Sequence, residues 1–337
     1  MTANSNTKTT LEDLAKLAGV SISTVSRALN DQPLISTRTK QRIWALARDH
    51  DYPFRASMPT APIGAEGSIA IVTPHMRGRA LPLSHPFFLE LLAGIGEAAR
   101  ARSCDFTVSH VAPESFDDLV LATTTSRASG VIFLGQSMLH EEFNQLAETN
   151  ARFVVWGAHV PGQKYRSIGS DNLLGGRRAT LHLARLGRKA IVFIGGSDPE
   201  AEQRRRGYLE ALAESGIASD TKLVAQVEFE LESAEAAITR LLRRGTVFDG
   251  IVAASDLIAL GAIRALRRAG LSVPADVSVV GYDDMLLSRL STPALTTIRQ
   301  DTFHAGQLLV ASILEPSQDR SPGYLPTELI VRESCGG

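Results

Sequence analysis

Cysteine is scarce in this sequence, and long hydrophobic runs are absent. Its 337 residues include two cysteines, Cys104 and Cys335, which are far apart and belong to no Cys-x-x-Cys or Cys/His pattern. We therefore expect no metal site, no disulfide framework and no cofactor. No apolar run approaches the ~18 residues of a membrane-spanning helix. The N-terminus, MTANSNTKTT, lacks the apolar core of a signal peptide. The sequence thus predicts a cytoplasmic protein with no membrane partner.

The sequence also has almost no excess of charge of either sign, because its net charge is only −1. Taken alone, this value argues against a nucleic-acid partner. The distribution along the chain changes that interpretation. Residues 1–60 carry eight lysines and arginines against five acids, and the remainder is mildly acidic. A basic head on an acidic body is typical of a small DNA-contacting domain joined to a larger one.

The head contains a segment, residues 10–30, that reads TLEDLAKLAGVSISTVSRALN. Thr10 and Asp13 have the spacing of a capping box at the start of a helix. Gly19 is suited to end that helix, because glycine adopts the left-handed conformation without steric cost. Ser21 is suited to cap a second short helix, of which Val25 and Leu29 form the inner face. Two short helices joined by a glycine turn predict a helix-turn-helix, with a generic helical hairpin as the alternative.

The outward face of the second helix carries small hydroxyl side chains and one arginine: Ser23, Thr24, Ser26 and Arg27. Hydroxyl groups bind phosphates at short range, and arginine binds guanine through two hydrogen bonds. This face therefore predicts contact with DNA.

A third helix is expected from the cap residue Ser36 to about His50, and it closes a three-helix core. Its inner positions are Ile43, Leu46 and Ala47. Basic residues near its start are suited to face phosphates or simply to be solvated: Arg38, Lys40 and Arg42. The helical pattern then gives way to a proline- and glycine-containing linker.

From Ser68 onward, short apolar runs alternate with amphipathic segments of helical length, which predicts buried parallel strands in βαβ units. The alternation covers more chain than one sheet needs, so we expect an α/β body of two lobes with ligand binding beyond the carboxyl ends of the strands. The expected strands begin at Ser68, Phe106, Val131, Phe153, Ala190, Gly250 and Val277, with a final strand around Leu329–Val331. The expected helices are Phe87–Arg102, Phe116–Arg127, Leu173–Leu186, Arg204–Ser215, Ala234–Arg244 and Leu257–Ala269.

The predicted organisation is therefore an all-α helix-turn-helix domain over residues 1–58, a linker over 59–67 and a two-lobed body over 68–337. No heptad tail follows the expected final strand. For this reason we expect a homodimer rather than a tetramer.

Several segments together resemble the lactose-repressor (LacI/GalR) family of transcriptional regulators. The first is residues 10–30 with ISTRTKQRIWALARDHDY after them. Later segments are HPFFLELLAGIGEAA from His85, SDNLLGGRRATLHLARLGRKAIVFIGG from Ser170, RRRGYLEAL from Arg204, SDLIALGAIRALRRAGLSVPADVSVVGYDD from Ser255 and PALTTIRQD from Pro293. The resemblance covers nearly the whole chain. It implies a dimeric regulator of double-stranded DNA with a two-lobed, periplasmic-binding-protein-like (type I) effector domain and parallel sheets.

The resemblance also implies roles for residues of the head. Base contacts fall on Ile22, Ser23 and Arg27. Phosphate contacts fall on Ser21, Thr24, Ser26, Asn30, Ser36, Arg38 and Thr39. For Ser21 and Ser36, helix capping is an alternative role that is compatible with phosphate contact.

For the effector pocket, the resemblance implies Phe87, Phe88, Trp156, Asp171, Arg204, Asp256 and Asp283. Carboxylates and a guanidinium bind hydroxyl groups, and aromatic rings stack on the apolar face of a sugar. Helix capping is the alternative for Asp171 and Asp256, and a purely structural core role is the alternative for Phe87 and Phe88. Ser255 stands where many family members have asparagine.

The implied function is a repressor that binds a palindromic operator under the control of a sugar or glycoside. A purine or another metabolite is the alternative effector, and a solute-binding protein is the alternative from another class. Nucleophile-elbow, P-loop and metal-ligand spacings are absent, so no enzyme is expected.

The linker departs from the family pattern. Pro59 replaces the arginine of the family's hinge helix and Ala61 replaces its wedge leucine, with Met58 as a possible substitute. Proline disrupts a helix interior, and alanine is too short to separate base pairs. We therefore expect no full hinge helix on DNA and little kinking of the operator centre.

Overall fold

The computed structural model describes residues 9–29, 32, 35–50, 67–73, 75–76, 79–80, 84–109, 111–124, 128–136, 138–315 and 321–337. The chain divides into two compact units, residues 1–66 and 67–337. The expected hinge segment around Pro59 lies outside the described residues.

The first unit consists of three helices, α1 (Leu11–Ala18), α2 (Ile22–Leu29) and α3 (Thr37–Asp49). Their apolar faces meet in one small core, as the helical spacing predicts. The fully buried members of this core are Leu14, Ala15, Ala18, Val25, Ala28, Ile43 and Ala47, with Leu29 and Leu46 packed against them. The predicted three-helix head is therefore confirmed.

The residues that were predicted to begin and end the first helix have these roles in the structure. The Thr10 side chain accepts a hydrogen bond from the Asp13 amide, and the Asp13 carboxylate accepts one from the Thr10 amide. This reciprocal capping box satisfies amides that have no partner inside the helix. Gly19 follows α1 in the left-handed conformation, with φ of 61°. Local sequence chemistry thus fixes the turn between α1 and α2.

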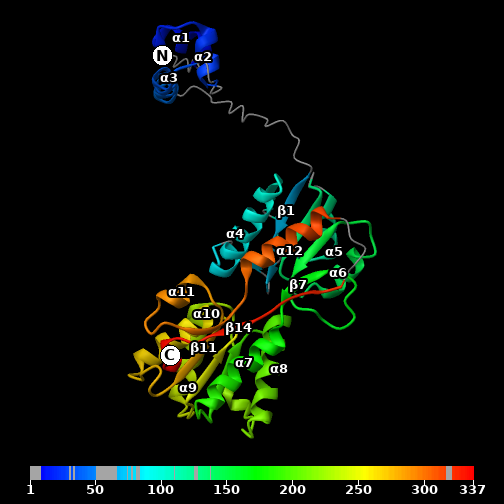
Figure 1. Cartoon of the computed structure of the whole chain (residues 1–337), viewed down its shortest axis with the longest axis vertical. Helices are drawn as coiled ribbons and strands as arrows, with labels where there is room; N and C mark the ends of the chain where they lie inside the picture. Colours follow the sequence, from blue (N-terminus) through cyan, green and yellow to red (C-terminus); the bar gives the residue numbers. More distant parts are fainter. Residues whose placement is uncertain are drawn as a thin grey trace, which may run out of the picture. The chain divides into compact units, whose positions relative to one another are not determined.

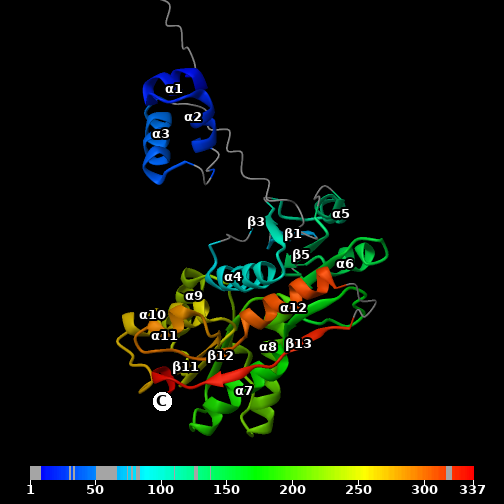
Figure 2. The same cartoon turned by 45° about the horizontal axis from the view of Figure 1, so that its top comes forward.

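The second unit contains two six-stranded sheets, each of which forms one lobe (Figures 1 and 2). The sheet of the first lobe has the order β13-β7-β6-β5-β1-β4, and its paired strands are parallel. Its strands are β1 (Ser68–Val72), β4 (Asp105–Val108), β5 (Gly130–Leu134), β6 (Phe153–Trp156), β7 (Ser167–Ser170) and β13 (Gly323–Leu325). A separate antiparallel pair is formed by β2 (His75–Met76) and β3 (Arg79–Ala80).

Helices cover both faces of the first sheet. On β1, Ile69 and Ile71 pack with α4 (Pro86–Ala101) and α12 (Thr302–Leu314). Ala70 and Val72 belong to the core under α5 (Phe116–Thr124) and α6 (His140–Leu146). Because successive side chains of a strand point to opposite faces, this run is apolar throughout.

The sheet of the second lobe has the order β14-β12-β11-β10-β8-β9, in which β14 is antiparallel to β12. In this lobe α7 packs against α8, and α9 packs against α10. The strands are β8 (Ile191–Gly195), β9 (Val224–Gln226), β10 (Gly250–Ala253), β11 (Ser278–Asp283), β12 (Thr296–Arg299) and β14 (Glu328–Ile330). The helices are α7 (Asn172–Arg185), α8 (Pro199–Glu214), α9 (Leu231–Arg243), α10 (Asp256–Arg268) and α11 (Leu286–Leu290), with short 3₁₀ turns at Thr221–Leu223 and Glu333–Cys335.

The chain passes between the lobes three times. It crosses from β7 to α7, returns from β12 to α12, and crosses again from β13 to β14. Figure 1 shows the last crossing as the long red segment that runs along both lobes. The predicted two-lobed α/β body with parallel-rich sheets is confirmed.

One predicted strand differs from its expected environment. The segment that begins at Phe106 does form β4, but all four residues of β4 are exposed. It pairs with β1 alone and lies at the edge of the sheet. In the central strands apolar side chains indicate burial, but in β4 they do not.

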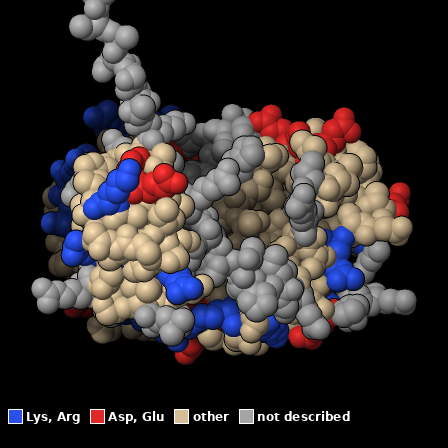
Figure 3. Space-filling view, turned by 90° about the horizontal axis from the view of Figure 1, so that it is seen from above, with Lys and Arg blue, Asp and Glu red and all other residues tan. Residues whose placement is uncertain are grey.

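Both cysteines are buried free thiols. Within the described ranges, no helix is long and apolar enough to cross a membrane. Among the residues coloured in Figure 3, basic and acidic side chains are interspersed with uncharged ones.

Candidate functional site

The start and surface of α2 present about half of the residues that were predicted to meet DNA. Ser21, Ser23 and Arg27 are exposed, and the Ile22 side chain is 47% exposed although it is apolar. Thr24 and Ser26 are half-buried. An exposed isoleucine between small hydroxyls suits contact with a thymine methyl group, and Arg27 is the long donor of this face.

Ser21 and Ser36 both act as helix caps. Ser21 Oγ accepts a hydrogen bond from the Thr24 amide at 3.2 Å, and Ser36 Oγ accepts one from the Thr39 amide at 3.3 Å. Arg42 donates to the carbonyl oxygen of Ala18 at 2.6 Å. Arg42 therefore ties α3 to the end of α1. Asn30 and the side chain of Arg38 lie outside the described part of the chain.

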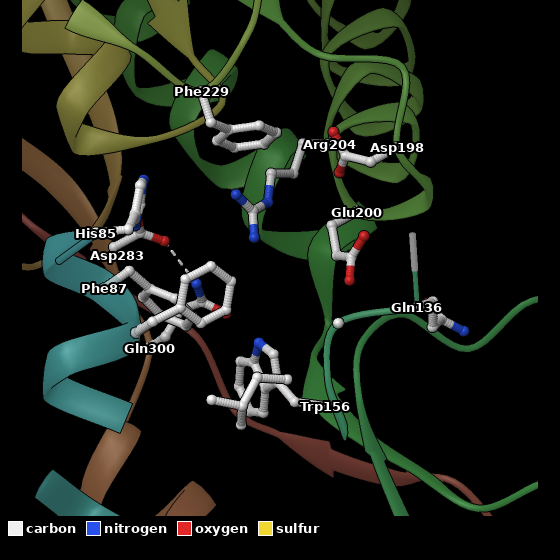
Figure 4. A pocket seen from close by; sticks show the side chains of 13 residues that line it. His85, Phe87, Gln136, Trp156, Asp198, Glu200, Arg204, Phe229, Asp283 and Gln300 are labelled. Atoms are coloured by element: carbon white, nitrogen blue, oxygen red, sulfur yellow. Dashed lines mark hydrogen bonds between the residues drawn. The ribbon is translucent and has the colours of Figure 1, made fainter. Parts of the chain in front are cut away.

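A second site is a cavity between the two lobes, with a volume of about 90 Å³. This is room for several water molecules. Aromatic and ionisable side chains from both lobes surround it (Figure 4). The lining residues are His85, Phe87, Phe88, Leu134, Gly135, Gln136, Trp156, Asp198, Glu200, Arg204, Phe229, Asp283 and Gln300.

The aromatic part of the lining comes mainly from the first lobe. The Phe87 ring lies 5.7 Å from the rings of both Phe88 and Trp156, and His85 lies 5.5 Å from Phe88, between ring centroids. Figure 4 shows Trp156 and Phe87 on one side of the cavity and Phe229 of the second lobe on another. Burial lowers the pKa of His85, against an opposing effect of a hydrogen bond of poor geometry with the Phe229 main chain. These rings offer flat apolar surfaces to a ligand.

Arg204 enters the cavity from α8 and is held by several partners. Its Nε donates to Asn172 Oδ1 at 2.8 Å, and its Nη1 donates to the carbonyl oxygen of Ala254. The side chain is buried, and its Cζ lies over the ring of Tyr282. The guanidinium is therefore fixed in place before any ligand binds.

Asp283 lies at the end of β11 and is connected to the crossing strands. Gln300 Nε2 donates to Asp283 Oδ1 at 2.6 Å, and Ser170 Oγ donates to Gln300 Oε1 at 2.6 Å. Asp283 has φ of 123°, a backbone conformation that residues other than glycine rarely adopt. Burial raises the pKa of Asp283 well above the usual range of a carboxyl group, although the positive charge of Arg204 opposes this. Through Gln300 and Ser170, the site is thus hydrogen-bonded to two of the three segments that cross between the lobes.

Two further carboxyl groups lie at the start of α8. Asp198 caps this helix by accepting a hydrogen bond from the Ala201 amide at 2.9 Å. Burial and the negative charge of Asp198 raise the pKa of Glu200 to about 8. Several buried polar atoms of the lining have no hydrogen-bond partner of good geometry within the described structure: Asp198 Oδ2, Gln136 Oε1 and both ring nitrogens of His85. Buried polar atoms normally have a partner, and an imidazole ring carries at least one donor, so these atoms point to a ligand that both donates and accepts hydrogen bonds.

Five of the seven predicted pocket residues line this cavity: Phe87, Phe88, Trp156, Arg204 and Asp283. Asp171 and Asp256 do not. Asp171 caps α7 by accepting a hydrogen bond from the Leu174 amide at 2.9 Å. Asp256 is fully buried and accepts bonds from the Met285 amide at 2.9 Å, from Thr297 Oγ1 at 2.5 Å and from Ser288 Oγ. Its carboxyl oxygens are already used within the fold, and the cap of α10 is Ser255 instead.

Sequence analysis missed six residues of the lining that are polar or aromatic: His85, Gln136, Asp198, Glu200, Phe229 and Gln300. A signal for some of them was available. Gln136 follows β5, Asp198 follows β8 and Gln300 follows β12, and each is at the carboxyl end of a parallel strand. Ligands of open α/β sheets bind at such ends.

Comparisons with known proteins match both parts of the chain. The sequence profile of the lacI family of bacterial regulatory proteins matches residues 10–53, and that of a periplasmic binding protein-like domain matches residues 180–335. The HTH-type transcriptional regulator CelR of Thermobifida fusca is 31% identical, over 96% of this chain and 98% of the relative. The chain belongs to the LacI family.

Solved structures of LacI-family proteins have the same fold. A transcriptional regulator CelR–cellobiose complex has a TM-score of 0.69 and 30% identity, covering 97% of this chain and all of its own. A lac repressor dimer bound to operator and the anti-inducer ONPF has a TM-score of 0.70 and 27% identity, covering 97% and 99% of the two chains. The likeness therefore extends over both the head and the two lobes.

Proposed function

We propose that this LacI-family protein is a dimeric transcriptional repressor whose affinity for a palindromic operator is set by a sugar or glycoside bound between its lobes. The observation that carries the proposal is the cavity, in which aromatic rings and fixed polar groups from both lobes surround one space. In this proposal the protein binds DNA and effector and catalyses no reaction.

The exposed surface of α2 supports the DNA-binding part. In a helix-turn-helix the second helix lies in the major groove, and Ile22, Ser23 and Arg27 are exposed on this helix for base contact. A dimer presents two such heads, which is why a palindromic site is expected. The operator-bound dimer among the related structures is in keeping with this arrangement.

The chemistry of the cavity supports a sugar. Trp156 and Phe87 supply apolar faces, and Arg204, Asp283 and Gln300 supply donors and acceptors in fixed positions. A sugar ring has apolar faces and a rim of hydroxyl groups that both donate and accept. The bound cellobiose of the related CelR complex has the same chemistry.

The crossings between the lobes supply a mechanism. Hydrogen bonds also join the lobes directly. Gln203 Nε2 of the second lobe donates to the His159 carbonyl oxygen of the first at 2.6 Å, and the Leu286 amide of the second donates to Glu90 of the first at 2.9 Å. A ligand in the cavity stabilises the arrangement of lobes that contacts it best. The resulting change in lobe angle alters how a dimer presents its two heads to DNA.

The test is a mobility-shift assay with the full-length protein and DNA from upstream of its own gene and neighbouring genes, with and without a panel of sugars. We expect a specific complex whose stability changes with one sugar. The Trp156→Ala variant should bind the same DNA but lose that response, because it lacks a stacking face. A wild-type protein that shows no preference for any of these fragments over random DNA would contradict the proposal.

A further inference from the structure

His85 is a buried histidine of the cavity whose polar atoms have no use within the fold. It is 8% exposed, and neither Nδ1 nor Nε2 has a hydrogen-bond partner of good geometry in the described structure. His85 occupies the N-cap position of α4, but its side chain makes no capping hydrogen bond. An unpaired buried polar group lowers the stability of a fold. Such a group is therefore expected where a ligand supplies the missing partner.

Gln136 presents a second unpaired atom, and its side chain is held in one orientation. It is 1% exposed, its Nε2 donates to Tyr165 Oη at 2.7 Å, and Tyr165 Oη lies 3.1 Å from His140 Nδ1. A phenol oxygen can accept one bond and donate its proton to another partner, so Tyr165 can bond both neighbours. Gln136 also packs on the bare backbone of Gly157, where a Cβ would lie 2.7 Å from Gln136 Oε1. The amide oxygen is left without a partner in the described structure.

The two unpaired groups approach the cavity from different directions. Figure 4 shows His85 on the left of the cavity and Gln136 on the right, with Trp156 below. Burial favours the neutral form of the His85 ring, which has one donor and one acceptor. Gln136 Oε1 is an acceptor only. A hydroxyl group both donates and accepts, so it can satisfy either residue.

On this basis we propose that His85 and Gln136 are effector-binding residues that determine specificity, because each bonds a hydroxyl group at a different edge of the sugar ring. The proposal rests on the proposed function, since it names contacts of the effector of that same site. A sugar that lacks either hydroxyl group leaves a buried atom of the cavity unpaired. Sites built to bond a hydroxyl group strongly reject analogues without it.

Titration calorimetry of the full-length protein tests the contacts with glucose, galactose, mannose, xylose and cellobiose as probes. The variants His85→Phe and Gln136→Met keep a similar shape and remove the unpaired atoms. We expect each variant to bind operator DNA as wild type does, and to bind the sugar that wild type binds at least about 10-fold more weakly. The matched control is His182→Phe, since His182 is a half-buried histidine of α7 outside the lining.

The outcomes of this titration separate the inference from the proposed function. Sugar affinity unchanged in both variants would overturn the inference and leave the proposed function intact. Failure of all five sugars to bind wild-type protein would overturn the sugar assignment itself, and the inference with it.

Monodeoxy analogues of the sugar that binds locate the two contacts. In wild type, the analogue without the hydroxyl group that His85 bonds should bind at least about 10-fold more weakly. That loss should disappear in His85→Phe, because the variant has no partner for the hydroxyl group. In Gln136→Met the loss should disappear for an analogue modified at a different position. Disappearance at the same position in both variants, or at none, would overturn the assignment of two edges.

Thermal melting without sugar separates a binding role of His85 from a structural one. An apolar ring in place of an unpaired buried polar ring is neutral or stabilising, so His85→Phe should melt at or above the wild-type temperature. The reference for a structural residue is Leu91→Ala, because Leu91 is a fully buried residue of the same helix and its truncation leaves a cavity. A fall in melting temperature as large as that of Leu91→Ala would make His85 a packing residue and overturn its assignment.

Discussion

The guanidinium carbon of Arg204 lies 3.6 Å from the ring centroid of Tyr282, over a side chain that is 1% exposed. A desolvated cation over an aromatic face is stabilised by about 2 kcal/mol. Tyr282 lies on β11 directly before Asp283, and Arg204 extends from α8. The stack therefore joins two elements of the second lobe at the wall of the cavity.

Replacing Arg204 with lysine should weaken sugar binding and lower thermal stability. A single ammonium cannot replace both the Nε bond to Asn172 and the Nη1 bond to Ala254, nor can it stack as a guanidinium does. We expect a loss of about 1–3 kcal/mol in unfolding free energy. Arg205→Lys is the control, since Arg205 pairs only with Glu202 in the described structure. Calorimetry measures the sugar affinity of both variants and thermal melting their stability. Equal values for the two variants would show that the Arg204 contacts make no energetic contribution.

Replacing Arg27 with alanine should reduce both affinity and sequence discrimination. The expected cost is about 1–3 kcal/mol per half-site, with relaxed specificity at one operator position. The control Lys16→Ala removes the same charge from α1 and should leave the discrimination unchanged. Binding to operator and to random DNA is measured at the same salt concentration. Equal losses on both DNAs would identify Arg27 as a phosphate contact instead.

Two glycines of α4 should respond oppositely to alanine. A Cβ at Gly94 would lie 2.5 Å from the Thr302 carbonyl oxygen, where α12 begins. Gly94→Ala should therefore destabilise the fold by about 1–3 kcal/mol through overpacking. A Cβ at Gly96 would meet the Phe106 ring at 3.5 Å, an ordinary contact. Gly96→Ala should be neutral or stabilising by up to about 1 kcal/mol, because alanine favours helix. Urea unfolding measures the stability of both variants. Equal unfolding midpoints would contradict the close packing of α4 on α12.

The carboxylate of Asp284 should make stability depend on pH in the acid range. Asp284 is buried, and it accepts bonds from Arg299 at 2.7 Å, from Arg289 at 3.2 Å and from Arg332. Burial alone would raise the pKa of Asp284, but the bonds from Arg299 and Arg332 hold it below 3.8. A carboxyl with a lowered pKa stabilises the folded state above its unfolded pKa, and this contribution disappears as the pH falls through the folded pKa.

The Asp284→Asn variant tests this contribution, because asparagine also tolerates the left-handed conformation found there, with φ of 61°. We expect it to lose about 1–3 kcal/mol at neutral pH. The difference from wild type should shrink as the pH falls below about 4. A difference that stays constant from neutral to acid pH would show that the charge of Asp284 does not contribute.

The head could be predicted from sequence because its signals are local. Thr10, Asp13 and Gly19 act within one turn of their own helix. The same holds for β1, β5 and β8, whose apolar residues are buried on both faces of a sheet. The linker hypothesis around Pro59 remains a prediction.

Two strands at the crossings, β7 and β12, were missed because they are polar. In β12, Thr297 is buried and bonded to Asp256, and in β7, Ser170 is buried and bonded to Gln300. In a sequence, such residues are typical of turns and caps. Their partners are 41 and 130 positions away, so no local pattern indicates them.

Two predicted pocket residues, Asp171 and Asp256, lie outside the lining of the cavity for a related reason. A carboxylate between a strand and a helix has the same sequence context whether it caps the helix, holds a neighbouring loop or binds a ligand. Asp198, Asp171 and Asp256 share this context, yet only Asp198 lines the cavity. Three-dimensional packing alone separates the three roles.

The three crossings have a consequence for synthesis on the ribosome. The first lobe begins with β1 at Ser68, yet its α12 and β13 come from Thr302–Leu314 and Gly323–Leu325. Until those last segments leave the exit tunnel, the α4 side of that sheet lacks its second helix, and β7 has an unpaired edge. The second lobe is likewise incomplete until β14 emerges. Neither lobe can therefore be completed or expressed as one contiguous fragment, and the emerging chain exposes apolar surface until residues 302–330 have been synthesised.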